Sequence, residues 1–327
     1  MARITETKSA KKKNKGYNSV IAFIFCDKYS SRNHADLFKL DSRFVKVDIQ
    51  EFCLSLNIKI DNGIVELKST TYDLDKIRDN IVYYAPYSYE SIYFSPLAGD
   101  TSYHFAKRQL STLVLFVEGW LEENCHVINS PSSGRQWSNK LYQLAHLQRE
   151  LNKNIIPTLI TSDYNLLSVN SIIKHLSEGR MVTKSITSHC LVVTADLIST
   201  LQTDKVLPVI NQAIVVADCE YRCYVMNDNY VLVCFSRASL YDGEVDIHSV
   251  NAVEGVEINP ISKVYMKLIA GIRQSCGLKY FAVDIFNDNN TLKIIEINPL
   301  FTWHTLSATL CRNISKTFLK SITHDRI

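Results

Sequence analysis

The sequence lacks the features that mark several large classes of protein. Its 327 residues include only 10 glycines and 7 prolines, too few for a fibrous or low-complexity chain. No apolar run reaches the ~18 residues that a membrane span needs, because Glu118 interrupts the run Ser111–Leu121. The Lys-rich N-terminus has no apolar stretch of the kind found in a signal peptide. We therefore expect a globular, cytoplasmic protein with no membrane partner.

The cysteines and histidines show none of the common metal-binding spacings. There is no CxxC and no HExxH, and three residues separate the closest pair of cysteines, Cys219 and Cys223. Several of the nine cysteines lie in or beside apolar segments, where cysteine behaves as a small hydrophobic residue. This pattern favours reduced thiols over a disulfide framework or a zinc site.

Positive charge is concentrated at one end of the chain. Residues 1–20 hold six basic residues and one acidic residue, a charge of +5, whereas the whole chain carries +3, which leaves −2 for residues 21–327. That remainder shows no cluster of Lys and Arg interleaved with aromatic residues, the pattern of nucleic-acid binders. We expect residues 1–19 to form a basic disordered tail, and we expect no nucleic-acid partner.

Strand-like and helix-like segments alternate after the tail, which indicates an α/β (α+β) fold class. Val20–Cys26 is typical of a buried strand, and the apolar residues of Ser102–Leu121 recur at helical intervals. Turn-forming residues at Asn129 lead into a helix expected over 136–152. A helix over 260–276 and a closing helix over 305–322 flank a hairpin. We predict an N-terminal α/β domain, a central subdomain and a C-terminal subdomain over 20–128, 129–208 and 209–327.

The predicted hairpin, Tyr280–Ile297, carries the clearest chemical signal. Asp284 and Glu296 each lie within an apolar strand, and a buried carboxylate is normally paired or bound to a cation. Asn298 follows Glu296 at a spacing that puts both side chains on one side of a strand. Three oxygen donors without His or Cys suit Mg²⁺. The alternative is that each carboxylate lies on the solvated face of a half-exposed sheet.

A shared metal site requires one register of the hairpin. If Asp284 and Glu296 lie on the same face, the numbers of any two paired residues must sum to an even value. Phe286 would then pair with Asn290 or Leu292. Pairing of Phe286 with Thr291 would place the carboxylates on opposite faces and exclude the site.

Four segments occur in an order that resembles the ATP-grasp ligases: INSPSSGRQWSNKLYQL, QAIVVADCEYRCYV, LKYFAVDIF and KIIEINPLFTW. More narrowly, they resemble the microviridin-type or graspetide maturases, which crosslink ribosomally made peptides. The resemblance spans roughly Cys125–Ser321. It implies an ATP-grasp fold with an N-terminal α/β unit and two α+β subdomains that clasp ATP. It also implies ATP and Mg²⁺ as cofactors, a precursor peptide with a leader segment as partner, and a homodimer as one oligomeric state.

The resemblance assigns the nucleotide site to four positions. Lys140 and Lys184 match lysines that contact phosphates, and Gln212 with the backbone of Ile214 matches the hinge that reads adenine. The loop after Lys184 reads SITSHC and departs from the family, which often has glycines there.

The same resemblance assigns the chemistry to five further residues. Arg222 and Arg237 match arginines that stabilise the transferring phosphoryl group and the acyl phosphate, a role that suits planar, permanently charged donors. Asp284, Glu296 and Asn298 match the metal ligands.

The implied activity is ATP-dependent ligation. Asp or Glu side chains of the precursor peptide would become acyl phosphates, and a hydroxyl or an amine would then form an intramolecular ester or amide crosslink. Two alternatives stay open. One is an ATP-grasp ligase that joins amino acids to a small molecule or a protein terminus. The other is a non-catalytic nucleotide-binding partner protein, which the glycine-free loop favours and the three oxygen donors disfavour.

Overall fold

The computed structural model describes most of the chain and divides it into two compact units. The described residues are 3–4, 22–27, 30–62, 64–86, 101–162, 180–184, 190–194, 209–213, 215, 217–237, 255–288 and 291–324. One unit combines residues 1–134 with 302–327, and the other comprises residues 135–301. These limits differ from the three domains expected from the sequence, and that division stays a prediction.

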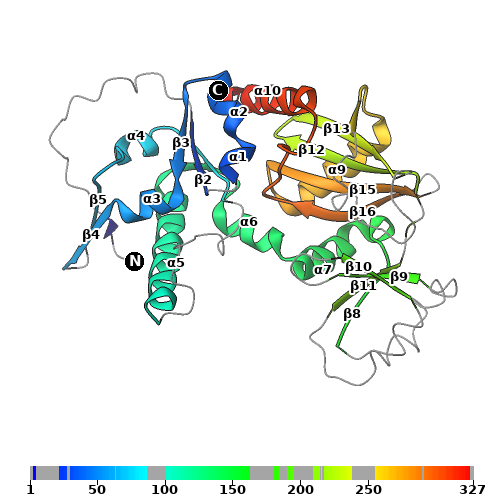
Figure 1. The fold of residues 1–327 in the computed structure, drawn as a ribbon, viewed down its shortest axis with the longest axis horizontal. Coiled ribbons are helices and arrows are strands. Elements are labelled where there is room, and N and C mark those ends of the chain that lie inside the picture. The colour runs from blue at the N-terminus through cyan, green and yellow to red at the C-terminus, as the bar shows by residue number, and fades with distance from the viewer. Residues whose placement is uncertain are drawn as a thin grey trace. The chain divides into compact units, whose positions relative to one another are not determined.

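The first unit is built on a parallel sheet in the order β3-β2-β6-β7 (Figure 1). All residues of β2 and β6 are buried, as in parallel sheets that are covered on both faces. The predicted strand at Val20–Cys26 and the predicted helix at Ser102–Leu121 correspond to β2 and α5. The elements of this sheet are β2 (Ala22–Cys26), α1 (Ser30–Asn33), α2 (Ala35–Leu40), β3 (Phe44–Asp48), α3 (Ile49–Leu54), α4 (Leu74–Arg78), β6 (Ile81–Tyr84), α5 (Thr101–Asn124) and β7 (His126–Ile128).

A smaller sheet in the first unit has the order β1-β5-β4. Strands β4 (Leu56–Asp61) and β5 (Ile64–Ser69) form an antiparallel hairpin, and Asn62 in its turn has a φ of 49°. Strand β1 (Arg3–Ile4) pairs in parallel with β5, within the segment where the sequence predicts a disordered tail.

The C-terminal helix α10 (Ala308–His324) packs against α2 in the first unit. Trp303, just before it, is buried and donates from Nε1 to Ser315 Oγ at 3.1 Å. The Trp303 ring also meets the ring of buried His34 edge to face, with centroids 5.2 Å apart. These contacts are the reason that residues 302–327 group with the N-terminal part of the chain.

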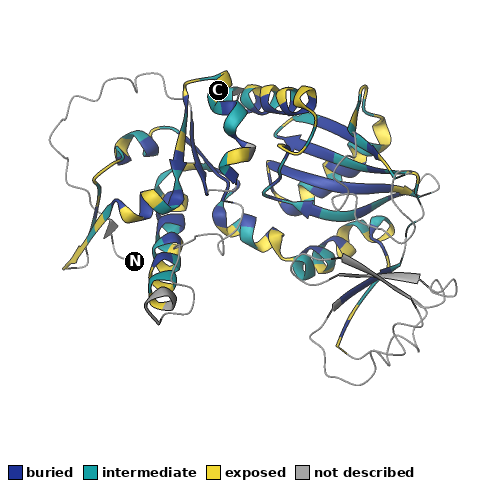
Figure 2. Cartoon of the chain, in the orientation of Figure 1, coloured by how far each residue is buried: buried dark blue, intermediate teal, exposed yellow. Residues whose placement is uncertain are grey.

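The second unit contains an antiparallel sheet in the order β14-β13-β12-β15-β16. Helices α7 (Lys140–Leu151) and α9 (Lys263–Cys276) cover one of its faces. A Cβ at Gly271 would lie 3.2 Å from Leu151 Cδ2, so that glycine permits close packing of the two helices. The central strands are buried along most of their length (Figure 2). The strands are β12 (Cys219–Met226), β13 (Asn229–Ser236), β14 (Gly255–Ile258), β15 (Tyr280–Asp288) and β16 (Thr291–Asn298).

The second unit also contains an antiparallel sheet in the order β10-β9-β11-β8. Its strands are β8 (Thr158–Thr161), β9 (Arg180–Lys184), β10 (Cys190–Thr194) and β11 (Val209–Ala213).

The single helix predicted over 136–152 is wrong, because the chain breaks it at Asn139. Helix α6 (Pro131–Ser138) ends there, α7 begins at Lys140, and the short 3₁₀ helix η2 (Asn152–Asn154) follows α7. The Asn139 side chain accepts hydrogen bonds from the backbone N–H groups of Leu141 and Tyr142, at 3.0 and 3.1 Å. Asparagine is a favoured residue at this N-cap position, so the local sequence restarts the helix.

The predicted hairpin register is wrong at the tip and correct at the carboxylates. Phe286 pairs with Lys293 rather than with Asn290 or Leu292, whereas Asp284 pairs directly with Glu296. A β-bulge explains why the two pairings differ, because Ile295 is an extra residue of β16 between them. The even-sum rule assumed an unbroken ladder, and the bulge shifts the register by one residue.

Among the described residues, no helix is both long and apolar enough to cross a membrane.

Candidate active site

Three charged side chains lie in a row across adjacent strands of the five-stranded sheet. Arg222 on β12 pairs with Asp284 on β15, and Asp284 pairs with Glu296 on β16. Directly paired residues of antiparallel strands project to the same face. The flanking residues Val283 and Ile285 belong to the core beneath α7 and α9. The row therefore lies on the sheet face that these helices leave uncovered.

Arg222 and Asp284 form a buried, two-pronged ion pair. The guanidinium Nε lies 2.5 Å from Asp284 Oδ1, and Nη2 lies 2.7 Å from Oδ2. The side chains are 11% and 4% exposed. Burial lowers the pKa of Arg222, but attraction to Asp284 outweighs burial and holds that pKa well above its ordinary value. Each charge of the pair depends on the other, because neither side chain is well hydrated.

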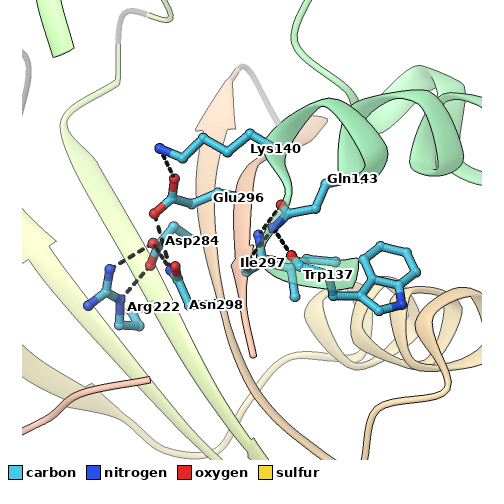
Figure 3. Close-up of polar contacts among 8 residues, drawn as sticks. All are labelled: Trp137, Lys140, Gln143, Arg222, Asp284, Glu296, Ile297 and Asn298. Carbon is cyan, nitrogen blue, oxygen red and sulfur yellow. Dashed lines mark hydrogen bonds and ion pairs between the residues drawn. The ribbon is translucent and has the colours of Figure 1, made fainter. Parts of the chain in front are cut away.

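Asn298 links two members of the row, and Lys140 contacts one of these two (Figure 3). Asn298 Nδ2 donates to Asp284 Oδ2 at 3.0 Å and to Glu296 Oε1 at 3.2 Å. Lys140 Nζ lies 3.0 Å from Glu296 Oε2, in a pair whose side chains are 23% and 25% exposed. We call Arg222, Asp284, Asn298, Glu296 and Lys140 the polar cluster. Its two cations balance its two carboxylates, and it runs from a buried end to a partly exposed end.

The donor set of the polar cluster fits a divalent cation of the Mg²⁺ type. Asp284 and Glu296 supply carboxylate oxygens, which accept several bonds each, and a half-turn of the Asn298 amide would present its oxygen beside them. Nowhere in the described parts of the chain do three or more His, Cys, Asp or Glu side chains gather in a way that would hold a metal. An oxygen from Asn298 is thus needed for a three-residue site. The assignment of metal ligands stays a prediction.

Arg237 lies beside the polar cluster rather than within it. Its guanidinium lies over the Phe286 ring, 4.8 Å from the centroid, and Nη1 lies 4.0 Å from Glu220 Oε2. Glu220 shares a face of β12 with Arg222 and pairs with Phe286 on β15. Glu220 therefore lies between the two predicted catalytic arginines. No sequence pattern assigned a role to Glu220, although its i+2 spacing from Arg222 places both side chains on one face of the strand.

Two of the remaining predicted nucleotide residues, Lys184 and Gln212, lie in the four-stranded antiparallel sheet of the second unit. Lys184 ends β9 opposite Ile210 of β11, and only its backbone is described. Gln212 on β11 is buried and donates from Nε2 to Thr158 Oγ1 at 3.1 Å. Ile214 lies outside the described residues. The structure therefore places Lys140 beside Glu296, and the nucleotide-binding roles of all four positions stay predictions.

Comparison with known proteins identifies a fold. No family model and no curated protein matches the chain. Macrocyclase MdnC from Microcystis aeruginosa MRC, bound with precursor peptide MdnA, matches with a TM-score of 0.70 at 15% identity, over 92% of this chain and 99% of its own. A RiPP-associated ATP-grasp ligase from Chryseobacterium gregarium, in complex with ADP and a leader and core peptide, gives 0.74 at 16% identity, over 94% and 97%.

A third solved structure extends this likeness. The ATP-grasp ligase PsnB, complexed with a minimal precursor, Mg and ADP, gives a TM-score of 0.65 at 18% identity, over 95% of this chain and 100% of its own. The near-complete coverage means that both compact units find counterparts in these proteins. The α/β (α+β) class predicted from the sequence is confirmed, and the chain has the fold of the ATP-grasp ligases.

Proposed function

We propose that this chain is an ADP-forming ATP-grasp ligase that crosslinks a ribosomally made precursor peptide. The observation that carries the proposal is the polar cluster, within a fold shared with ATP-grasp ligases. Two carboxylates, an amide and an arginine lie on one sheet face, and a lysine at the start of α7 contacts one of the carboxylates. The oxygen donors would bind a metal ion, and the cationic side chains would bind phosphates. The metal ion and the phosphates would bind together because their opposite charges neutralise each other.

The roles follow from the chemistry of each side chain. Asp284, Glu296 and Asn298 would hold Mg²⁺, which supplies charge neutralisation at the phosphates. Lys140 and Lys184 would contact phosphates, and Gln212 with the Ile214 backbone would contact adenine. Arg222 and Arg237 would stabilise negative charge on the acyl phosphate and the departing phosphate.

The proposed reaction balances without a covalent enzyme intermediate. An Asp or Glu carboxylate of the peptide takes the γ-phosphoryl group of ATP, and ADP leaves. A hydroxyl or amine of the same peptide attacks the acyl carbon, the bond to phosphate breaks, and the nucleophile loses its proton. The peptide loses one water per crosslink. Positioning and electrostatic stabilisation supply the rate.

The peptide partner is supported by the three similar structures, which hold a precursor peptide, a leader and core peptide, and a minimal precursor. The proposed enzyme binds a leader segment of the peptide outside the reacting centre and forms a homodimer. All eight cysteines with described side chains are free thiols, which supports a location in the reducing cytoplasm.

Ligand-induced stabilisation tests the nucleotide site. We expect the Mg²⁺–ATP complex, at ~100 times its dissociation constant, to stabilise the wild type by ~2.7 kcal/mol. Asp284→Asn should lose most of this stabilisation, whereas Asp228→Asn should retain it, since Asp228 is 80% exposed and pairs with Arg273. The proposal fails if the wild type is not stabilised or if Asp284→Asn responds like the wild type.

Mass spectrometry tests the reaction. Candidate precursors encoded beside the gene should lose one water per crosslink, with ADP formed in equal amount. ADP formation with free amino acids and an unchanged peptide would point instead to a small-molecule ligase. Nucleotide binding without any ADP formation would point to the non-catalytic partner protein.

A further inference from the structure

We propose that Gln143 is a positioning residue that ties α7 to the edge strand β16 and so keeps Lys140, Glu296 and Asn298 in one arrangement. The inference rests on the proposed function, because the three side chains it positions are a proposed phosphate contact and two proposed metal ligands. It adds a residue that neither the sequence analysis nor the family resemblance singled out.

Gln143 binds the outer edge of β16 as a neighbouring strand would. Among the described residues β16 is the last strand of its sheet, and Ile155 forms an isolated parallel bridge with its Ile294. Gln143 Oε1 accepts from the Ile297 N–H at 2.9 Å, and Nε2 donates to the Ile297 carbonyl at 2.6 Å (Figure 3). Nε2 also donates to the Trp137 carbonyl at the end of α6. One buried amide therefore satisfies both backbone groups of a single edge residue.

Ile297 is the residue through which this contact would control the site. It lies between Glu296 and Asn298, whose side chains project to the face opposite its own. Fixing the two peptide groups of Ile297 therefore restricts the direction of both neighbouring side chains. The restriction matters here because the bulge at Ile295 interrupts the regular ladder just before Glu296.

The same contact restrains the other side of the site. Gln143 is three residues after Lys140, so the two residues lie on neighbouring positions of one helical surface. Lys140 Nζ lies 3.0 Å from Glu296 Oε2. Holding Gln143 against Ile297 thus fixes the distance between the helix that carries the lysine and the strand that carries the carboxylate. Outer contacts of this kind orient metal ligands and are typically worth 10–100-fold in metal affinity.

The chain offers a matched control on the same strand. Asn154, in η2, donates from Nδ2 to the Leu292 carbonyl at 2.7 Å, which ties the segment after α7 to the far end of β16. Asn154 and Gln143 therefore make the same kind of bond, a side-chain amide to an edge carbonyl. Leu292 is on the other side of the bulge from Glu296, so loss of the Asn154 bond should affect stability without moving the proposed ligands.

The experiment compares Gln143→Met with Asn154→Leu in thermal unfolding. The probe is Mg²⁺ titrated at a fixed, saturating concentration of ADP, and the readout is the Mg²⁺ concentration that gives half of the full stabilisation. We expect Gln143→Met to raise this midpoint at least tenfold over the wild type. We expect Asn154→Leu to change it less than twofold, even where its unliganded melting temperature falls as far.

Two outcomes overturn the inference, and they differ from each other. If the wild type shows no Mg²⁺-dependent stabilisation by ADP, the proposed function fails and the inference fails with it. If the wild type responds and Gln143→Met has the wild-type midpoint, only the positioning role fails. If Gln143→Met does not fold, Gln143→Glu, which still accepts from the Ile297 N–H, is measured in its place. We expect its Mg²⁺ midpoint to lie above that of the wild type, and a wild-type midpoint would overturn the positioning role.

Discussion

The two units of the chain bury polar groups in different ways. In the first unit, Glu118 is 1% exposed and accepts a hydrogen bond from the Tyr84 hydroxyl at 2.6 Å. His34, also 1% exposed, is surrounded by aromatic rings and contacts the Ser30 carbonyl through Nδ1 at 2.8 Å. In the second unit, the buried pair Arg222–Asp284 continues through Asn298 to the partly exposed pair Glu296–Lys140.

This difference distinguishes polar groups that are buried within a core from polar groups that a ligand can reach. Glu118 and His34 are held deep in the core of their unit, where their polar groups contribute to the specific packing of that core. The polar cluster begins in the sheet but reaches partly exposed oxygens at Glu296, where an added cation or phosphate would compete with Lys140. We therefore expect changes in the first unit to alter stability alone, and changes along the cluster to divide between stability and ligand binding.

The largest effect should come from removing the buried cation of the cluster. Arg222→Ala leaves the Asp284 carboxylate buried without its main partner, which costs about 3–5 kcal/mol of unfolding free energy. Urea denaturation measures this loss. Arg273→Ala is the matched control, since its partner Asp228 is 80% exposed and such pairs contribute about 0–1 kcal/mol. Equal losses in the two variants would contradict the contrast between buried and exposed pairs.

The next largest effect should be a pH dependence in the first unit. Burial lowers the pKa of His34 from 6.5 to about 4, so between these values the unfolded chain binds a proton that the folded chain does not. The contribution of neutral His34 to the unfolding free energy is therefore fully present above pH 6.5. As the pH decreases to 4, the unfolding free energy falls by about 3 kcal/mol. His34→Phe should remove this slope.

Tryptophan fluorescence measures the pH effect within the correct unit. In a Trp137→Phe background the remaining tryptophans, Trp120 and Trp303, both lie in the first unit. Urea unfolding followed by their emission at pH 7, 5.5 and 4.5 compares His34 with His34→Phe. Parallel pH profiles for the two proteins would show that His34 does not titrate as its burial requires.

A smaller loss should follow from Tyr84→Phe. The change removes a hydrogen bond to a buried carboxyl group, and loss of one partner of a buried polar group costs about 1–3 kcal/mol. Glu118→Gln should cost less than Tyr84→Phe, because its amide oxygen still accepts from the hydroxyl. The same fluorescence assay applies to both. Neither variant should change the stabilisation by ATP and Mg²⁺, and a change would place Glu118 among the groups that bind ligand.

The smallest change in stability is expected at the exposed end of the polar cluster. Lys140→Met removes a partly exposed ion pair and should alter the unfolding free energy by less than about 1 kcal/mol. The same variant should weaken ADP binding in the presence of Mg²⁺ at least tenfold, measured by calorimetry. Lys293→Met is the control, since Lys293 Nζ donates to the backbone carbonyl of Lys153, away from the polar cluster. Equal affinities in the two variants would remove Lys140 from the site.

The hairpin shows which structural features the sequence patterns predicted in this chain. Apolar alternation placed Asp284 and Glu296 in strands, and i+2 spacing placed Asn298 beside Glu296. Alternation also contained a sign of the bulge, because the apolar positions shift by one between Ile294 and Ile297. The bulge allows both isoleucines to face the helices while Glu296 faces away. A rule that assumed regular pairing could not use that sign, and the tip register was therefore predicted wrongly.

The sequence by itself determined the alternation of elements, the carboxylates within apolar strands and, through resemblance, the ATP-grasp fold. These properties depend on local spacing, because side chains repeat every two residues in a strand and every 3.6 in a helix. Only the tertiary structure decided that Arg222 meets Asp284, that Gln143 meets Ile297 across 154 positions, and that α10 packs against α2. Contacts between segments far apart in the chain depend on how whole sheets and helices pack, and no local period encodes them.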